Sequence, residues 1–225
     1  MAESTVMDDI RRALGHAAST LPEPLPPFSE SITPANAETR LARFVDEARA
    51  VRAQVQVVPD KEDLVHRISE ICGAHQGEMA LSAGGILSEV NLAQALSARG
   101  HRTMLTSRSG YQHEEMVTRL ANCSVGITVA DYAIAETGTI VLSSDEKHAL
   151  LVSLLPPVHI AVLRAAQIMT GLEEVIESLN QERIGRDDPC HSASFITGPS
   201  RTSDVELTLS IGVHGPKELH VIILN

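Results

Sequence analysis

Two carboxylates, Asp131 and Glu136, lie five residues apart within Thr128–Leu142, a stretch of small and hydroxyl residues between two β-rich runs. If both side chains entered one pocket, one could act as a general acid and the other as a general base. The alternative is a structural role, in which Asp131 caps the turn and Glu136 accepts hydrogen bonds from backbone amides. The residue types leave both roles open, and we take this pair as the candidate catalytic residues.

A second candidate site follows the β-rich run 192–196. We predict that a helix begins within 198–206, where free backbone N–H groups could hold a small carboxylate or a phosphate. A guanidinium at this place would add bidentate contacts to the anion. The alternative is a plain capping segment, with a capping box between Ser203 and Glu206 and with the guanidinium in solvent. The candidate anion-binding residues here are Ser200, Arg201 and Thr202.

Two further turns carry residues that let a ligand approach the backbone closely. Gly84 and Gly85 lie at a predicted strand-to-helix turn, and Thr137 and Gly138 lie beside the carboxylate pair. We include all four as candidate anion-binding residues. The glycine pair lacks the spacing of a dinucleotide-binding motif and of a P-loop, so a tight structural turn is the alternative reading.

The sequence lacks the usual motifs of metal sites and of serine-hydrolase nucleophiles. The ten histidines show no HExxH arrangement, and no GxSxG elbow is present. Cys72, Cys123 and Cys190 lie far apart without a CxxC pair, which is the spacing that zinc and iron–sulfur sites commonly use. We therefore expect no metal and no cofactor in this chain, and a reducing compartment.

The composition of the chain argues against two classes of binding partner. The share of apolar residues, 43%, and of charged residues, 21%, is typical of a globular protein. Aromatic residues make up only 2% and the formal net charge is −11, which argues against binding to nucleic acid or to an anionic membrane. Neither a basic leader nor an apolar run of about 20 residues is visible. We expect a soluble cytoplasmic protein.

The domain organisation follows from the proline content near the N-terminus. Residues 5–18 have the apolar spacing of a short amphipathic helix, and four prolines follow within Leu21–Pro27. We predict an N-terminal helix and proline-rich arm over residues 1–35 and one domain over residues 36–225.

Helical patterns alternate with β-rich runs from about residue 37 onward. The predicted helices are 37–52, 61–73, 86–98, 112–121 and 171–181. The predicted strands are 54–58, 78–82, 101–105, 124–129, 138–143, 158–163, 192–196 and 218–224. This alternation predicts an α/β fold with a largely parallel sheet flanked by helices. Runs 125–129 and 139–142 are too close for a crossover helix, so a hairpin or a tight return is expected there.

The candidate residues would need to meet at one edge of this sheet. Loops 82–85, 130–138 and 197–202 each follow a predicted strand. In open α/β sheets, ligands bind beyond the carboxyl ends of the strands. We therefore expect Asp131, Glu136 and Arg201 to share one cavity.

Two motifs resemble a known family. They are Ala130–Thr139 and Gly198–Glu206, and the second is followed by Gly212–Val221. Together, in this order and separation, they resemble the lactate-utilisation protein C family, which is also described by its LUD domain. The resemblance extends from about residue 40 to the end of the chain.

The resemblance implies a fold related to the sugar-phosphate isomerase and CoA-transferase-like group. It also implies a role beside an iron–sulfur protein and a second subunit in converting L-lactate to pyruvate, with the iron–sulfur clusters in the partner. The related isomerases place acidic residues in a turn after a central strand, where Asp131 and Glu136 occupy a similar position. The glycine-rich run and lysine that follow in those isomerases are replaced here by Ile140–Ser143.

Three functions remain open from the sequence. The first is an accessory or substrate-handling subunit of the lactate-oxidising system. The second is a stand-alone enzyme that acts on a small anionic carbonyl or sugar-phosphate compound through Asp131, Glu136 and Arg201. The third is a regulatory or scaffold protein whose N-terminal helix docks on a partner. Assembly into a homo-oligomer is also open.

Overall fold

The computed structural model describes residues 36–106, 113–143, 149–183, 192–203 and 209–225. The chain divides into two units, Met1–Thr33 and Pro34–Asn225, and the fold below is that of the second unit. The helix predicted at 5–18 and the proline-rich arm lie outside the described residues.

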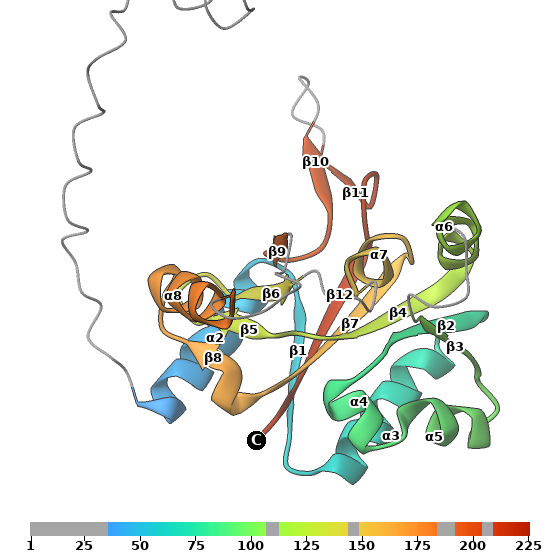
Figure 1. The fold of residues 1–225 in the computed structure, drawn as a ribbon, viewed down its shortest axis with the longest axis horizontal. Coiled ribbons are helices and arrows are strands. Elements are labelled where there is room, and N and C mark those ends of the chain that lie inside the picture. Colours follow the sequence, from blue (N-terminus) through green and yellow to red (C-terminus); the bar gives the residue numbers. More distant parts are fainter. Residues whose placement is uncertain (1–35, 107–112, 144–148, 184–191, 204–208) are drawn as a thin grey trace, which may run out of the picture. The chain divides into compact units, whose positions relative to one another are not determined.

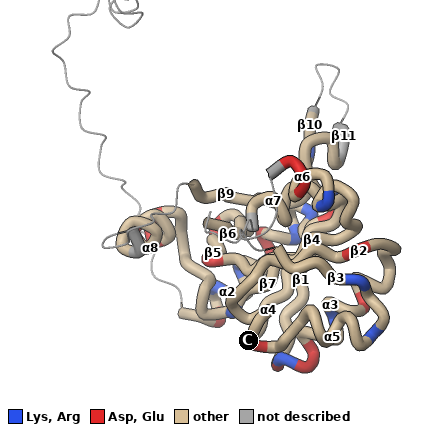
Figure 2. The backbone as a smooth tube through the Cα atoms, turned by 45° about the vertical axis from the view of Figure 1, so that its right-hand side comes forward, with Lys and Arg blue, Asp and Glu red and all other residues tan. Residues whose placement is uncertain are grey.

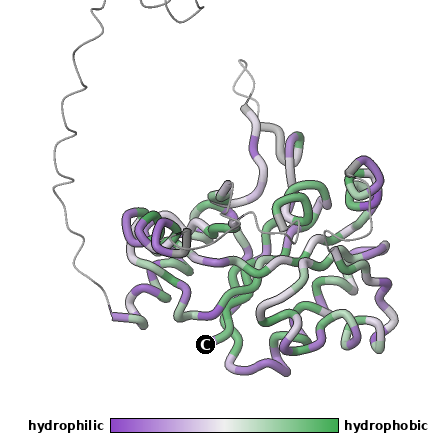
Figure 3. The backbone as a smooth tube through the Cα atoms, viewed as in Figure 1, coloured by the Kyte–Doolittle hydropathy of each residue, from purple (hydrophilic) through white to green (hydrophobic). Residues whose placement is uncertain are grey.

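A six-stranded parallel sheet forms the centre of the unit (Figure 1). In spatial order its strands are β1 (Gln54–Val58), β12 (Glu218–Leu224), β7 (Val158–Arg164), β4 (Cys123–Val129), β2 (Glu78–Ser82) and β3 (Arg102–Thr106). The central strands are apolar along almost their whole length, which is typical of parallel strands covered on both faces (Figure 3). The predicted α/β class with a largely parallel sheet is confirmed. The likeness to the isomerase and CoA-transferase-like group stays a prediction.

Helices cover both faces of this sheet. Their bounds are α2 (Ala37–Ala50), α3 (Lys61–Gly73), α4 (Gly85–Glu89), α5 (Leu92–Ala98), α6 (His113–Ala121), α7 (Ala149–Leu154) and α8 (Leu172–Arg183), with a 3₁₀ turn at Ala165–Gln167. On one face α3, α4 and α5 pack on the sheet through an apolar cluster that includes Ile68 and Leu92. On the other face α2 packs through Phe44, and α6 and α7 pack through Leu120 and Val152.

Side-chain caps explain where helices α2 and α3 begin. The Asn36 side chain accepts a hydrogen bond from the Thr39 N–H, and Asp60 accepts from the N–H groups of Glu62 and Asp63. The helix predicted at 86–98 is divided in two, because Asn91 adopts a left-handed conformation with a φ of 48°. Among the helices that the structure describes, none has the length and apolar character needed to cross a membrane.

A second, four-stranded sheet contains the tight return that the sequence predicts. Its order is β8 (Ile168–Met169), β5 (Tyr132–Ile134), β6 (Thr139–Ser143) and β9 (Ala193–Ile196). The hairpin is formed by β5 and β6, with Ala133 opposite Ile140, and β4 takes no part in it. The chain leaves the parallel sheet after β4 and builds a separate sheet, on which α8 packs through Val175 and Leu179.

The prediction that a helix begins within 198–206 is wrong. Arg201–Ser203 forms strand β10, which pairs antiparallel with β11 (Leu209–Ile211), and the two strands run away from the main sheet (Figure 1). A backbone that pairs as a strand cannot offer the free N–H groups of a helix start, so the proposed capping box at Ser203 is excluded. Glu206 lies outside the described residues.

Candidate functional site

Asp131 is held in the link between β4 and β5. Its Oδ2 accepts hydrogen bonds from the Ser143 N–H at 2.7 Å and from the Ser143 hydroxyl at 2.8 Å. The Gln167 side chain donates to the carbonyl oxygens of Ala130 and Asp131, at 2.8 and 3.0 Å. These contacts support the structural alternative for Asp131, because the carboxylate closes the return into the second sheet.

The other residues of this turn lie at the far end of β5. Glu136 is half-buried and its backbone N–H donates to the Thr170 carbonyl at 3.2 Å. Because Asp131 and Glu136 lie at opposite ends of a three-residue strand, the hairpin separates the two carboxylates rather than pairing them. Their catalytic roles stay a prediction.

Gly138 lies where the β5–β6 turn meets helix α2. Its φ is +62°, and a Cβ there would lie 2.2 Å from the Ala48 nitrogen. Thr137 lies beside it, and its hydroxyl is 2.7 Å from that of Thr139, which is 2.7 Å from that of Thr197. The glycine therefore permits close packing on α2.

Gly84 and Gly85 form the β2–α4 turn at the carboxyl edge of the main sheet. The Gly84 N–H donates to the Ser88 hydroxyl at 3.0 Å, and a Cβ on Gly85 would lie 3.1 Å from the Val129 side chain. The turn brings α4 onto the end of β4. An anion-binding role for these glycines stays a prediction.

Ser200, Arg201 and Thr202 lie at the opposite edge of the sheet. The Ser200 N–H donates to the Pro216 carbonyl at 2.9 Å, directly before β12 begins, and Arg201 is exposed on β10. The physical reason is that loop 197–202 follows β9, which belongs to the second sheet and not to the parallel one. The three predicted loops therefore do not gather at one edge, and the expectation of one shared cavity is wrong. The small carboxylate or phosphate ligand stays a prediction.

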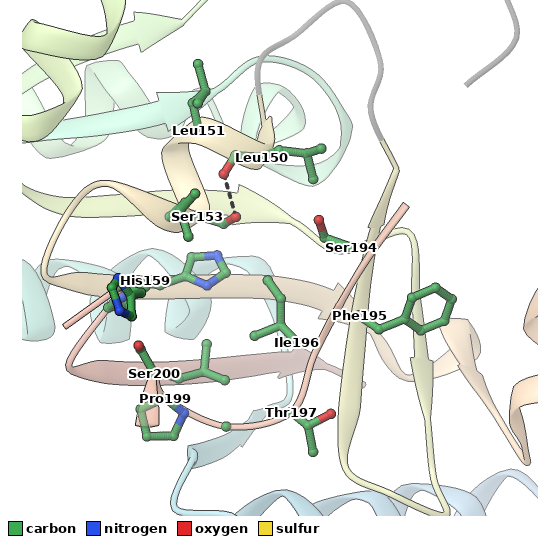
Figure 4. Close-up of a pocket in the computed structure, with 16 residues that line it drawn as sticks. Leu150, Leu151, Ser153, His159, Ser194, Phe195, Ile196, Thr197, Pro199 and Ser200 are labelled. Atoms are coloured by element: carbon green, nitrogen blue, oxygen red, sulfur yellow. Dashed lines mark hydrogen bonds between the residues drawn. The ribbon is translucent and has the colours of Figure 1, made fainter. Parts of the chain in front are cut away.

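A cavity of about 480 Å³ opens at the amino edge of the main sheet, and we call it the amino-edge cavity (Figure 4). Its walls are formed by α7, by Ser194–Ser200, and by His214–Pro216 with Leu219 at the start of β12. His159, the second residue of β7, also lines it. Of the residues predicted for a site, only Ser200 belongs to this lining.

His159 is the most distinctive polar residue of the amino-edge cavity. Its side chain is only 1% exposed, and its Nε2 lies 2.8 Å from the Thr128 hydroxyl oxygen. Its Nδ1 is buried and has no hydrogen-bond partner among the described residues. Burial in the sheet, followed by repulsion from His220, lowers the pKa of His159 to about 3, so the imidazole is neutral at physiological pH.

Charge is spread over the fold rather than collected at this cavity. Acidic and basic residues are interspersed along the backbone, and the described lining of the cavity contains no Lys, Arg, Asp or Glu (Figure 2). The described residues also contain no group of three or more His, Cys, Asp or Glu side chains arranged to hold a metal ion. The arrangement can bind a ligand through a neutral hydrogen bond at the bottom of an apolar cavity.

Sequence reasoning missed His159, because metal-binding spacing, the usual sign of a functional histidine, is absent around it. The available signal was its position in Val158–Leu163, where it is the only polar residue of a buried strand. A polar side chain in such a run must find a partner or face a cavity. Helix α7, with the sequence ALLVSL, was also missed, although it forms a wall of the cavity.

Comparison with known proteins extends over most of the chain. The LUD domain family matches residues 41–224. Lactate utilization protein C of Halalkalibacterium halodurans is 36% identical over 112 residues, which are 50% of this chain and 49% of that protein. This match thus spans about half the length of that relative. Lactate utilization protein C 1 of Bacillus mycoides is 28% identical over 73% of this chain and 80% of its own length.

Two further similarities cover the greater part of the domain. The uncharacterised protein YkgG of Escherichia coli is 25% identical over 96% of each chain. A crystal structure of a DUF162 family protein from Deinococcus radiodurans superposes with a TM-score of 0.60 at 24% identity, over 85% of this chain and 100% of that one. The structural likeness supports the fold, and the sequence matches confirm the resemblance expected from the two motifs. With residues 41–224 matched, the chain belongs to the LUD domain family.

Proposed function

We propose that this chain is an accessory subunit of a system that oxidises L-lactate to pyruvate, beside an iron–sulfur protein and a second subunit. The observation that carries the proposal is the LUD domain match over residues 41–224, together with relatives named lactate utilization protein C. The redox centres belong to the partners, and this chain acts in assembly or in handling the substrate.

The described thiols support an assignment of the iron–sulfur clusters to a partner. Cys72 and Cys123 are free and buried in different apolar clusters. Burial raises the pKa of the Cys72 thiol to about 12 and that of the Cys123 thiol to about 11, so both resist forming the thiolate that binds iron. Free thiols persist in a reducing compartment, which agrees with a place in the cytoplasm.

The test is copurification from the native organism, combined with deletion of the gene. The tagged full-length chain should retain a partner that carries the visible absorption of iron–sulfur clusters, and the deletion strain should lose growth on L-lactate while it grows normally on pyruvate. A tagged chain that retains no such partner, together with normal growth of the deletion strain on L-lactate, would exclude this function.

A further inference from the structure

The amino-edge cavity has the size and the walls of a small-molecule site. Its volume of about 480 Å³ lies within the range of about 300–1,000 Å³ that is usual for ligand sites. Leu150 and Leu154 of α7 belong to one apolar wall. Ile196 of β9 lies across from Leu150, and the neighbouring Phe195 ring points away from His159 (Figure 4). Leu154 is 49% exposed, so the apolar surface reaches the mouth of the cavity.

The inner end of the cavity is lined by His159, whose ring has one buried nitrogen without a hydrogen-bond partner among the described residues. Thr128, which is fully buried, contacts Nε2 of His159 and holds the ring in one orientation. This contact leaves Nδ1 as the atom with no partner among the described residues. Buried polar atoms are nearly always hydrogen-bonded, so an orphaned imidazole nitrogen beside a cavity points to a missing partner.

The lining also favours an uncharged ligand as the partner of Nδ1. Apart from the two histidines, the polar side chains of the described lining are hydroxyls, among them Ser194, Thr197 and Ser200, and His214 is exposed. The described lining contains no Lys or Arg to neutralise an anion and no Asp or Glu to neutralise an amine. A charged ligand would lose its hydration here without an ion pair in return.

We propose that the amino-edge cavity binds an uncharged, mostly apolar small molecule, whose single hydroxyl or carbonyl group forms a hydrogen bond with Nδ1 of His159. A hydroxyl serves either tautomer of the ring, because it can donate or accept. This site is separate from the carboxyl edge of the sheet, where Gly84, Gly85 and the Asp131 link lie. The proposal does not depend on the role in lactate oxidation.

The probe is 1-naphthol, compared with naphthalene, which lacks the hydroxyl, and with 1-naphthyl phosphate, which carries charge. The chain has no Trp, so naphthyl fluorescence can be followed with little background from the protein. We expect saturable binding of 1-naphthol to the full-length protein, and affinities for the two other compounds that are lower by about tenfold, the size of one lost hydrogen bond. No saturation up to about 1 mM, or equal or tighter binding of either comparison compound, would overturn the proposal.

His159→Gln tests the hydrogen bond directly. The Gln amide can keep a contact to Thr128 but has no atom in the place of Nδ1. In a variant with an unchanged circular dichroism spectrum, we expect 1-naphthol to bind about tenfold more weakly while naphthalene binding is unchanged. Unchanged 1-naphthol binding would show that Nδ1 does not contact the ligand.

A pair of surface variants tests the same site without a buried substitution. Leu154→Arg places a cation at the mouth of the cavity, and Leu172→Arg places one on α8 at a residue that is 51% exposed, close to the 49% of Leu154. We expect Leu154→Arg to shift the preference toward 1-naphthyl phosphate by about tenfold and Leu172→Arg to leave it unchanged. Equal behaviour of the two variants would place the binding site elsewhere and overturn the proposal.

Discussion

His159 links the amino-edge cavity to the pH dependence of stability. Its pKa in the folded protein is about 3, because burial and the nearby His220 disfavour the charged ring, whereas an unfolded histidine titrates near 6.5. Below pH 6.5 the unfolded chain therefore binds a proton that the folded chain excludes. The free energy of unfolding should fall by roughly 1 kcal/mol for each pH unit between about 6 and 4.

Denaturant unfolding of the wild type and of His159→Gln at several pH values between 4 and 7 checks this expectation. The slope of the unfolding free energy against pH should correspond to about one proton fewer taken up on unfolding in the variant, whatever the absolute stability of the variant. His220 adds to the slope in both proteins, since burial also lowers its pKa. Equal slopes in the two proteins would mean that His159 can be protonated in the fold.

Asp131 provides a test between its structural and catalytic roles. Asp131→Ala removes the acceptor of the Ser143 N–H and hydroxyl, and should lower the free energy of unfolding by about 1–3 kcal/mol. Asp131→Asn keeps an acceptor oxygen and should cost clearly less. Chemical denaturation of both variants measures the difference. If both leave stability unchanged, the carboxylate is not required for the turn, and the catalytic alternative gains weight.

At the scale of elements, local signals predicted the parallel core well. Strands β1, β2 and β12 and helix α3 have the predicted bounds, because each is a short apolar run or an amphipathic stretch bounded by a cap or a turn. The remaining elements depend on partners that are distant in the sequence. Three-residue β5 and two-residue β8 pair with each other from positions about 35 residues apart, and β10 is a strand only because β11 returns beside it.

The same limit explains the candidate site. The sequence indicates Gly84, Gly85 and Asp131 as turn residues after strands, and the structure places them there. It gives no indication that β9 joins a second sheet, and so the loop that carries Ser200 and Arg201 was expected at the wrong edge. The cavity combines α7, β7, β9 and the start of β12, whose proximity arises only from the tertiary fold.

The contact between the β5–β6 turn and helix α2 should be sensitive to a single methyl group. Gly138→Ala adds a Cβ against the backbone of Ala48 at a residue with a φ of +62°, and should destabilise the fold by about 2 kcal/mol or more. Two matched substitutions separate backbone strain from the close contact with α2. Gly100 has a φ of +88° and open space around the position of a Cβ, so Gly100→Ala introduces strain alone. Gly73, at the end of α3, has open space and no positive φ, so Gly73→Ala introduces neither.

Thermal or chemical unfolding of the three variants should rank them in one order. Gly138→Ala should be the least stable, Gly100→Ala should show the loss caused by backbone strain alone, and Gly73→Ala should equal or exceed the wild type, because Ala is the better helix former. If Gly138→Ala matched Gly100→Ala, the approach of the turn to α2 would be looser than the structure indicates.

At the scale of the whole molecule, the two edges of one sheet carry different features. The carboxyl edge contains the Gly84–Gly85 turn and the segment between β4 and β5 that holds Asp131. It also contains the ion pairs of Glu89 with Lys61 and Arg164. The amino edge contains the apolar cavity with His159. Because the cavity lies between the main and second sheets, a ligand there would contact both and could stabilise their association.

Removal of residues 1–33 tests how the chain divides between folding and association. Met1–Thr33 and Pro34–Asn225 are separate compact units, and the second contains the four apolar clusters of the described residues. We therefore expect Pro34–Asn225 to fold alone with a Tm within about 2 °C of the full chain. If the N-terminal segment docks on a partner, the shortened chain should lose copurification with it. A full-length control with residues 5–18 scrambled keeps length and charge but not the apolar spacing, and should fail in the same way. A shortened chain that retains the partner would place the docking surface on the LUD domain itself, and one that no longer unfolds cooperatively would make the first 33 residues part of the fold.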